Sequence, residues 1–331
     1  MNNPIDIVPP NSSAARLAAN LRGILLPFTT PFTASEDLNL EALRFNIQHW
    51  NRTGVSGYVA VGSTGERVNL NEREYLQVIE TARAEVPEQL SFIAGAGQQS
   101  TRNTIDEIKQ AASAGAEAVL VITPSFYRSA ITQAVLVDHY RAIADASPVP
   151  VILYSMPDLT GIVIEPDTVA TLSSHQNIIG IKDSSNNIPR FKETVDRVES
   201  GFTVLSGNGT VLCDALSAGA HGGILAVGCV AAAQCIEIQR HFMSGDLQSA
   251  SELQQLLTPL ALAVTKRYGI GGLKHALDLA GLNGGKVRVP LQSPDETARR
   301  EIAQLLDAVV NGPQTPNESE SPTGFAGALR T

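Results

Sequence analysis

The feature that most constrains the fold is a regular alternation of short apolar runs with amphipathic segments. Eight apolar runs of strand length cover residues 23–28, 57–62, 91–97, 118–124, 151–157, 178–184, 203–208 and 222–228. Between them, apolar residues recur at steps of three and four, as in residues 40–53, 72–86, 101–114, 134–146 and 188–198, which is typical of helices that cover a sheet. Because parallel strands require such crossovers, eight regular units predict an α/β fold, a closed (β/α)8 TIM barrel. A doubly wound open sheet, the alternative, more often has five or six strands and a dinucleotide-binding glycine loop.

The C-terminal third predicts helices that extend the barrel. Residues 231–243 supply the last barrel helix, and the helical patterns at 247–262, 272–279 and 297–309 predict a C-terminal helical appendage. The predicted organisation is an N-terminal arm at 1–22, the barrel at 23–245, the C-terminal helices at 246–311 and a tail at 312–331. The tail is rich in Pro, Ser, Glu and Asn, a composition that predicts disorder because it buries too little apolar surface.

Charge and cysteine content exclude several classes of protein. The net charge of −9 without a basic run argues against partners such as nucleic acid or an anionic membrane surface. No apolar stretch reaches the ~20 residues that a membrane helix needs. The three cysteines form no C-x-x-C pair, and an odd count suits a reducing compartment. We therefore expect a cytoplasmic protein; Arg16 and Arg22 give the N-terminus a faint likeness to a transit peptide, so a mitochondrial location is the alternative.

The residues that follow the predicted strands are chemically unusual. In a barrel of this kind, the active site lies at the carboxyl ends of the strands. Hydroxyls, amides and one amine gather there, in the segments 62–66, 123–127, 154–157, 182–184 and 206–209. A small-molecule site at that end of the barrel is therefore predicted.

Lys182 is the one lysine of six that lies inside an apolar strand. An amine buried without a carboxylate in register favours its neutral form, which attacks ketones to form a Schiff base. The alternative is a lysine at a strand end whose ammonium group reaches solvent. Strand alternation turns Ile179 and Ile181 toward the helices and Lys182 and Ser184 toward the lumen.

Tyr154 is expected to share the lumen with Lys182. The same alternation turns Val151 and Leu153 outward and Ile152 and Tyr154 inward. An iminium on Lys182 lets the adjacent carbon become an enamine, and each step needs a proton transfer for which Tyr154 is placed. The alternative is a core tyrosine with a satisfied hydroxyl.

The loop at 62–65 predicts an anion site. Its two glycines allow consecutive N–H groups to point at an anion, and Ser63 and Thr64 add hydroxyl donors for a substrate carboxylate. The alternative is an ordinary turn in which Glu66 begins a helical cap.

Four motifs together resemble a known superfamily. Residues 27–32 (Pro-Phe-Thr-Thr-Pro-Phe), 62–66 (Gly-Ser-Thr-Gly-Glu), 154–161 (Tyr-Ser-Met-Pro-Asp-Leu-Thr-Gly) and 180–184 (Gly-Ile-Lys-Asp-Ser) resemble the dihydrodipicolinate synthase and N-acetylneuraminate lyase superfamily of class I aldolases. The resemblance spans roughly residues 23–310. It implies a Schiff base on Lys182 and proton transfer by Tyr154. It also implies a pyruvyl carboxylate bound by Ser63 and Thr64, with the Ser63 hydroxyl in the proton relay.

The resemblance also bears on oligomeric state and cofactors. Tyr127 matches the relay tyrosine that reaches the neighbouring subunit's site, which implies a homodimer or homotetramer. No cofactor or metal is implied. A metal-dependent aldolase, a competing class, would need clustered ligands, whereas the six histidines have no ligand-like spacing. A non-catalytic sensor that binds pyruvate is a second competing class.

The choice among family activities depends on a few positions. Dihydrodipicolinate synthases carry an arginine where Leu159 stands, which argues against the lysine-pathway reaction. Sialic acid lyases typically have acidic residues after the seventh strand, where this chain has Gly207-Asn208-Gly209. A polyhydroxylated sugar acid would therefore lack partners.

Two further segments, residues 265–274 and 284–291, resemble the mitochondrial type of 4-hydroxy-2-oxoglutarate aldolase, as does Lys182-Asp183-Ser184. The serine of that last motif implies contact with the distal end of the substrate, although those aldolases tend to have Asn where Thr64 stands.

The predicted function is cleavage of a 4-hydroxy-2-oxo acid, most simply 4-hydroxy-2-oxoglutarate, to pyruvate and glyoxylate. The alternatives are a 2-keto-3-deoxy sugar-acid aldolase and a 4-hydroxy-tetrahydrodipicolinate synthase. The candidate catalytic residues are Lys182, Tyr154, Ser63 and Tyr127, and the candidate substrate-binding residues are Ser63, Thr64, Ser184 and Asn208.

Overall fold

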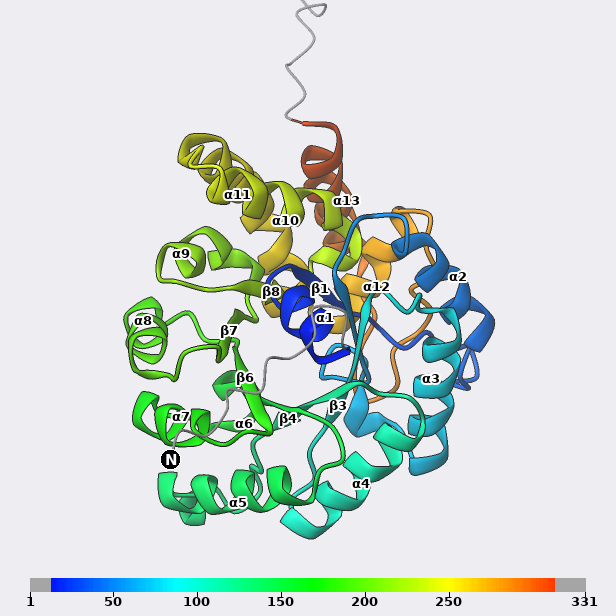
Figure 1. Cartoon of the computed structure of the whole chain (residues 1–331). Coiled ribbons are helices and arrows are strands. Elements are labelled where there is room, and N and C mark those ends of the chain that lie inside the picture. Colours follow the sequence, from blue (N-terminus) through cyan, green and yellow to red (C-terminus); the bar gives the residue numbers. More distant parts are fainter. Residues whose placement is uncertain (1–12, 313–331) are drawn as a thin grey trace, which may run out of the picture.

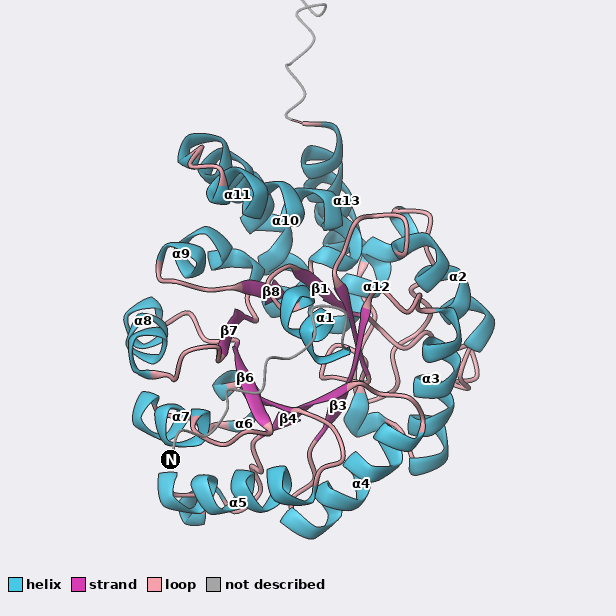
Figure 2. Ribbon diagram, in the orientation of Figure 1, coloured by secondary structure: helices cyan, strands magenta, loops and turns pink. Residues whose placement is uncertain are grey.

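Eight parallel strands close into a barrel in the computed structural model, which describes residues 13–312 (Figures 1 and 2). The strands are β1 (Ile24–Pro27), β2 (Gly57–Ala60), β3 (Ser91–Ala96), β4 (Ala118–Ile122), β5 (Val151–Ser155), β6 (Ile178–Asp183), β7 (Thr203–Ser206) and β8 (Gly222–Ile224). Each strand pairs with its neighbours in sequence, and β8 pairs with β1 to close the ring. The predicted (β/α)8 barrel and its eight strands are confirmed.

Helices cover the outside of the ring. They are α2 (Leu40–Trp50), α3 (Glu72–Glu85), α4 (Thr101–Ser113), α5 (Gln133–Ala146), α7 (Pro166–Ser173), α8 (Ile188–Arg197), α9 (Leu212–Ser217) and α10 (Gly228–Met243), with a short α6 (Pro157–Thr160) directly after β5. Side-chain caps fix several starts: Asn71 and Glu74 form a capping box on α3, and Ser100 caps α4, so backbone N–H groups that lack helical partners are satisfied.

Strand alternation divides the apolar core into two layers. An outer cluster between strands and helices includes Val151, Leu153 and Ile181, and an inner cluster inside the barrel includes Ile152 and Tyr154. Full burial of one such aliphatic side chain stabilises the fold by about 1.5–3 kcal/mol. The inward orientation predicted for Tyr154 and the outward orientation predicted for Ile181 are confirmed.

A bulge between β5 and β6 changes the orientation of one residue. Val151 pairs with Ile178, but Ile152 pairs with Gly180, so Ile179 is an extra residue in β6. Ile178 therefore packs in the outer cluster, and Ile179 packs against the inner one. The prediction that Ile179 faces the helices is wrong, because an extra residue shifts the alternation upstream of it. Beyond the bulge the register places Tyr154 opposite Lys182.

The N-terminal segment closes one end of the barrel. Helix α1 (Ser13–Asn20) lies across the opening of the ring in Figure 1. Leu17 and Leu21 join the inner cluster, and Arg16 forms an ion pair with Glu117 at 2.7 Å. The described part of the predicted arm is thus packed against the barrel, because its leucines cover the inner core. Residues 1–12 lie outside the described residues.

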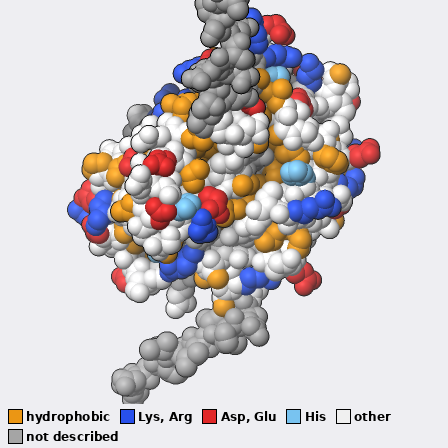
Figure 3. Space-filling model, turned by 90° about the horizontal axis from the view of Figure 1, so that it is seen from above, with side chains coloured by type: hydrophobic (Ala, Val, Ile, Leu, Met, Phe, Trp, Pro, Cys, Tyr) orange, Lys and Arg blue, Asp and Glu red, His pale blue; other side chains and the backbone are white. Residues whose placement is uncertain are grey.

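The C-terminal appendage consists of α11 (Leu247–Leu262), a π-helical turn (Ala263–Arg267), α12 (Gly269–Leu279) and α13 (Glu296–Asn311). Helix α10 is interrupted at Ala231, whose φ and ψ are −140° and 47°, so its regular part begins near the predicted start. Of the predicted tail, residues 313–331 lie outside the described residues. Within the described chain no helix is long and apolar enough to cross a membrane. Acidic and basic side chains are interspersed on the face in Figure 3.

Candidate active site

Lys182 and Tyr154 meet at the carboxyl ends of β5 and β6. The Lys182 side chain is only 4% exposed, so its amine does not reach solvent, and its Nζ lies 4.3 Å from the centre of the Tyr154 ring. The lysine ion pairs among the described residues involve Lys192, Lys266 and Lys274 instead. The Lys182 amine is therefore buried beside a phenol and without a paired carboxylate.

The Tyr154 hydroxyl links Lys182 to the loop after β2. Its oxygen lies 3.1 Å from Ser63 Oγ. Burial alone raises the pKa of Tyr154, but the charge of Lys182, the hydrogen bond with Ser63 and the nearby polar groups of Ser184 and Lys182 outweigh burial and hold that pKa below its ordinary value. A phenol with a lowered pKa exchanges protons more readily near neutral pH. Amine, phenol and hydroxyl thus form one connected group.

The loop that carries Ser63 is strained and closely packed. Val61, a β-branched residue, has φ +47°, which lies in the left-handed region that such residues rarely adopt. A side chain at Gly95 of β3 would lie 2.6 Å from Val61 O, so only glycine lets the two backbones approach. Thr30 Oγ1 donates to Gly65 O at 2.7 Å. Contacts from β3 and from the segment after β1 therefore hold this loop, and such strain often accompanies functional loops.

Ser184 and Gly207 form the other side of the Lys182 side chain. Ser184 is buried, and apart from its approach to Tyr154 its hydroxyl has no partner among the described residues. A methyl group at position 207 would lie 2.0 Å from Ser184 Oγ and 2.7 Å from Lys182 Cε. Gly207 therefore makes room for both side chains, a role that sequence reasoning did not assign to it.

Two other buried hydroxyls lie just beyond strand ends. Thr29 follows β1 and Thr123 follows β4, and neither side-chain oxygen has a hydrogen-bond partner within residues 13–312. Buried polar groups normally have partners, so unpartnered ones at a barrel mouth fit a site that receives a polar ligand. Thr64 is buried next to Ser63. This position is compatible with the predicted contact between Thr64 and a substrate carboxylate.

Asn208, Tyr127 and Leu159 do not join the Lys182 group. The Asn208 side-chain carbonyl accepts from Thr210 N at 3.0 Å and from Thr210 Oγ1 at 2.8 Å, so it stabilises the turn after β7. Tyr127 is 72% exposed and packs edge-on against the Phe126 ring at 5.0 Å. Leu159 on α6 is 63% exposed. The role of Tyr127 across a subunit contact stays a prediction.

Positive charge approaches α6 from two directions. A methyl group at Gly161, which ends α6, would lie 2.8 Å from Arg128 Nη1, so the Arg128 side chain lies against this end of the helix. Lys266, from the π-helical turn, pairs with Asp158 of α6 at 3.1 Å. Because α6 directly follows β5, both cations lie at the carboxyl rim of the barrel.

A buried ion pair ties the Ser63 loop to the appendage. Lys274 of α12 lies 2.6 Å from Glu66 Oε1, and both side chains are almost completely buried. Arg288 donates its backbone N–H to Glu66 Oε2 at 3.1 Å and binds Glu74 Oε2 through Nη1 at 2.7 Å. The segments at 265–274 and 284–291 thus contribute side chains that brace the Ser63 loop. Sequence reasoning missed this network, because nothing in the sequence pairs residues so far apart.

Side chains that could bind a metal ion are scattered over the described structure. No group of three or more His, Cys, Asp or Glu side chains in residues 13–312 could hold a metal ion. The three cysteines are free thiols. The arrangement at Lys182 can instead form a covalent imine with a ketone, with Tyr154 and Ser63 placed to move protons.

Known proteins resemble this chain in sequence and in fold. The chain is 36% identical over 270 residues to a 4-hydroxy-tetrahydrodipicolinate synthase from Rhodopseudomonas palustris, covering 82% of this chain and 90% of that one. It is 32% identical to one from Methanothrix thermoacetophila, covering 86% and 96%. Among solved structures, a dihydrodipicolinate synthase from Bacillus anthracis superposes with a TM-score of 0.83 at 27% identity, covering 86% and 97%.

A second solved structure comes from a complex with pyruvate. YagE, a prophage protein of the dihydrodipicolinic acid synthase family from E. coli K12, superposes with a TM-score of 0.80 at 28% identity, covering 87% of this chain and 98% of that one. The family model of the dihydrodipicolinate synthetases matches residues 20–309, which include the barrel and the appendage. The chain therefore belongs to the dihydrodipicolinate synthetase family and is an enzyme of its pyruvate-dependent aldolase and synthase class.

Proposed function

We propose that Lys182 forms a Schiff base with a 2-oxo acid and that Tyr154 and Ser63 carry the protons of the reaction. The observation that carries this proposal is the buried Lys182 amine, 4.3 Å from the centre of the Tyr154 ring, with the Tyr154 hydroxyl 3.1 Å from Ser63 Oγ. The amine attacks the ketone carbon, and loss of water leaves an iminium. Ser63, Thr64 and the backbone of their loop bind the carboxylate of the pyruvyl half.

Tyr154 then acts on the hydroxyl group of the substrate. With its lowered pKa, its phenolate takes the proton of the 4-hydroxyl, and the bond between carbons 3 and 4 breaks. The electron pair of that bond moves into the iminium and leaves an enamine on Lys182, and the aldehyde departs. Protonation of the enamine and hydrolysis release pyruvate and the free amine. In the reverse direction, the same groups join pyruvate to an aldehyde.

We infer that the aldehyde half carries a negative charge. Arg128 against α6 brings a cation to the rim of the barrel, where it favours an anionic group over a neutral sugar chain. Lys266 adds a second cation there, whose charge Asp158 balances. Cleavage of 4-hydroxy-2-oxoglutarate to pyruvate and glyoxylate satisfies this requirement. Leu159, exposed on the same helix, adds no charge of its own.

The second candidate is synthesis of 4-hydroxy-tetrahydrodipicolinate. It is supported by the names of the relatives, two of which match this chain at 32% and 36% identity. This reaction joins pyruvate to an amino aldehyde that also carries a carboxylate, so the rim cations suit it as well. Leu159 stands where the resemblance implies an arginine in the synthases, and this departure favours cleavage.

Borohydride trapping tests the shared chemistry. With pyruvate present, reduction should leave one covalent adduct per chain on the peptide that contains Lys182. Lys182→Met should show none, whereas Lys192→Met, which changes an exposed lysine, should be trapped like the wild type. An adduct on another lysine, or no adduct on the wild type, would overturn the proposal.

A substrate comparison separates the reactions. We expect kcat/KM for cleavage of 4-hydroxy-2-oxoglutarate to exceed that for a 2-keto-3-deoxy sugar acid and for formation of 4-hydroxy-tetrahydrodipicolinate. Arg128→Gln should lower kcat/KM for the anionic substrate by about tenfold or more, the value of a hydrogen bond to a charged group. Faster condensation than cleavage would select the second candidate and leave the Schiff-base step intact.

Tyr127 is proposed to complete the proton relay of a second copy. Its exposure and its contact with Phe126 leave its hydroxyl outside the Lys182 group of its own chain. If it serves a neighbour, mixing inactive Lys182→Met with inactive Tyr127→Phe chains should restore part of the activity, since one mixed site holds both wild-type residues. Mixtures without any gain would exclude this arrangement.

A further inference from the structure

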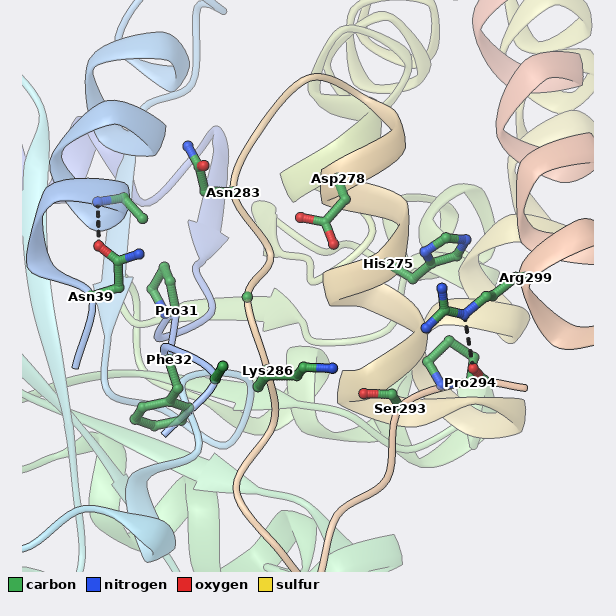
Figure 4. A pocket seen from close by; sticks show the side chains of 13 residues that line it. Pro31, Phe32, Asn39, His275, Asp278, Asn283, Lys286, Ser293, Pro294 and Arg299 are labelled. Atoms are coloured by element: carbon green, nitrogen blue, oxygen red, sulfur yellow. Dashed lines mark hydrogen bonds between the residues drawn. The ribbon is translucent and has the colours of Figure 1, made fainter. Parts of the chain in front are cut away.

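A polar pocket of about 430 Å³ lies away from the Lys182 group, between the segment after β1 and the appendage (Figure 4). One wall is formed by residues 31–42, and the other by α12, the loop that follows it and the start of α13. Its polar side chains are Asn39, His275, Asp278, Asn283, Lys286 and Arg299. None of the residues assigned above to the Schiff-base chemistry lines it.

Lys286 is held in place by its backbone while its side chain is unpaired. Its N–H donates to Phe32 O at 3.0 Å, and its carbonyl accepts from the buried Lys274 amine. Gly285 next to it has φ +70°, and a methyl group there would lie 2.6 Å from Phe32 O, so only glycine permits this approach. Within the described chain no ion pair involves the Lys286 amine, which extends toward α12 in Figure 4.

Arg299 and His275 lie on the side of the pocket that Lys286 points toward (Figure 4). Arg299 Nε donates to Pro294 O at 3.1 Å and lies 4.0 Å from Glu296 Oε1, and the described residues give its two Nη groups no hydrogen bond. Burial and the Arg299 charge lower the pKa of His275, so its ring is largely neutral at pH 7. Asp278 is the one carboxylate among the lining side chains, and its Oδ1 accepts from Gly284 N at 2.7 Å.

The charge balance of this pocket is opposite to that of the chain. Two permanent cations and one carboxylate line it, in a protein whose net charge is −9; the exposed carboxylate of Glu296, outside the lining, pairs with Arg299 at 4.0 Å. Cations that converge in a concave site attract anions and concentrate them locally. The volume falls within the range of small-molecule sites, roughly 300–1,000 Å³.

We propose that this pocket binds a small organic anion through a carboxylate or phosphate group held by Lys286 and Arg299. The neutral His275 ring and the Ser293 hydroxyl line the same side, and the amides of Asn39 and Asn283 bind polar groups at the other end. The site is distinct from the one that binds the 2-oxo acid, and it stands whether or not the proposed aldolase reaction does.

Titration calorimetry on the full chain tests the proposal with two probes, inorganic phosphate and malonate. At least one should bind saturably with one site per chain. Lys286→Gln and Arg299→Gln should each weaken binding by at least about tenfold. We expect both variants to fold, because Lys286 is anchored through its backbone and Arg299→Gln removes a side-chain hydrogen bond to Pro294 O and a partly exposed ion pair; unchanged thermal unfolding without probe verifies this.

Matched controls locate the site. Arg300→Gln alters the exposed neighbour of Arg299 on α13, and Lys109→Gln removes an exposed lysine on α4; both should bind like the wild type, as should Lys182→Met. Tighter binding of phosphate or of malonate tells which anionic group the pocket prefers. Absence of binding by both probes, or equal weakening by the control variants, would overturn the proposal.

Discussion

Two lysines of this chain are almost fully buried, and they differ in what surrounds them. Lys182 is 4% exposed and lies 4.3 Å from the centre of the Tyr154 ring, while Lys274 is 1% exposed and lies 4.5 Å from the centre of the Phe32 ring. Lys274 has a carboxylate, Glu66, at 2.6 Å. Lys182 faces hydroxyl groups instead. Burial beside an aromatic ring is thus common to both sites, and the partner of the amine distinguishes them.

The partner decides what each amine can do. Burial lowers the pKa of Lys274, and the Glu66 charge opposes that effect, so the pair fastens α12 to the loop after β2. An amine without a carboxylate is available to a ketone. A buried lysine therefore marks a reactive site only when its counter-charge is missing, and the following predictions test that distinction in order of expected effect.

Lys182→Met should abolish turnover with little effect on folding. Loss of the nucleophile should lower kcat/KM by at least about 10⁴-fold. An apolar side chain of similar length suits the buried position, so the free energy of unfolding should stay within about 1 kcal/mol of the wild type or rise. Steady-state kinetics and urea unfolding measure the two quantities. Retained turnover would show that Lys182 is not the nucleophile.

Lys274→Met should have the opposite profile. It leaves Glu66 buried and unpaired, which should lower the free energy of unfolding by about 3–5 kcal/mol. The double variant Glu66→Gln, Lys274→Met removes both charges and should recover most of this loss. Urea unfolding of the single and double variants measures the coupling. If the single variant were as stable as Lys182→Met, the contrast between the two lysines would fail.

Gly207→Ala should perturb the position of Lys182 and leave the network around Lys274 unchanged. Its methyl group would lie 2.7 Å from Lys182 Cε, so the amine must shift. A displacement of about 1 Å of a reacting group costs about 10²-fold in rate. We expect a fall in kcat/KM of this order without loss of cooperative unfolding. A wild-type kcat/KM for Gly207→Ala would show that the added methyl group does not displace the Lys182 amine.

Ser184→Ala should change the pH dependence of the reaction. The nearby Ser184 hydroxyl helps to lower the pKa of Tyr154, so its removal raises that pKa. Because the proposed base is the Tyr154 phenolate, the rise of kcat/KM with pH should move to higher pH, and the loss of rate should be greatest on the acidic side. Ser185→Ala is the control. An unshifted profile would show that Tyr154 does not titrate as the base.

Much of this arrangement could be predicted from the sequence. The eight apolar runs identified the barrel, and strand alternation brought Tyr154 inward, where the structure pairs it with Lys182. Alternation misplaced Ile179, because a bulge shifts the pattern without any mark in the sequence. No bounds were predicted for helices α7 and α9, since short helices of eight and six residues carry little periodic signal.

The bracing of the loop could not be predicted. Glu66 and Lys274 are ordinary charged residues in the sequence, and only the fold brings their side chains together in a buried ion pair. Gly207 is likewise one of 27 glycines, and its value depends on the side chains it adjoins.

The bond between Arg288 and Glu66 has a consequence for synthesis of the chain. These residues are 222 positions apart. At about 5–20 residues per second on the ribosome, the second partner is made about 10–45 seconds after the first. All eight strands are complete before then, but the Glu66 end of the Ser63 loop still lacks its anchor. The eight strands are therefore made before the last partner of the catalytic edge, and a chaperone or protease that samples the emerging chain meets this edge without that anchor.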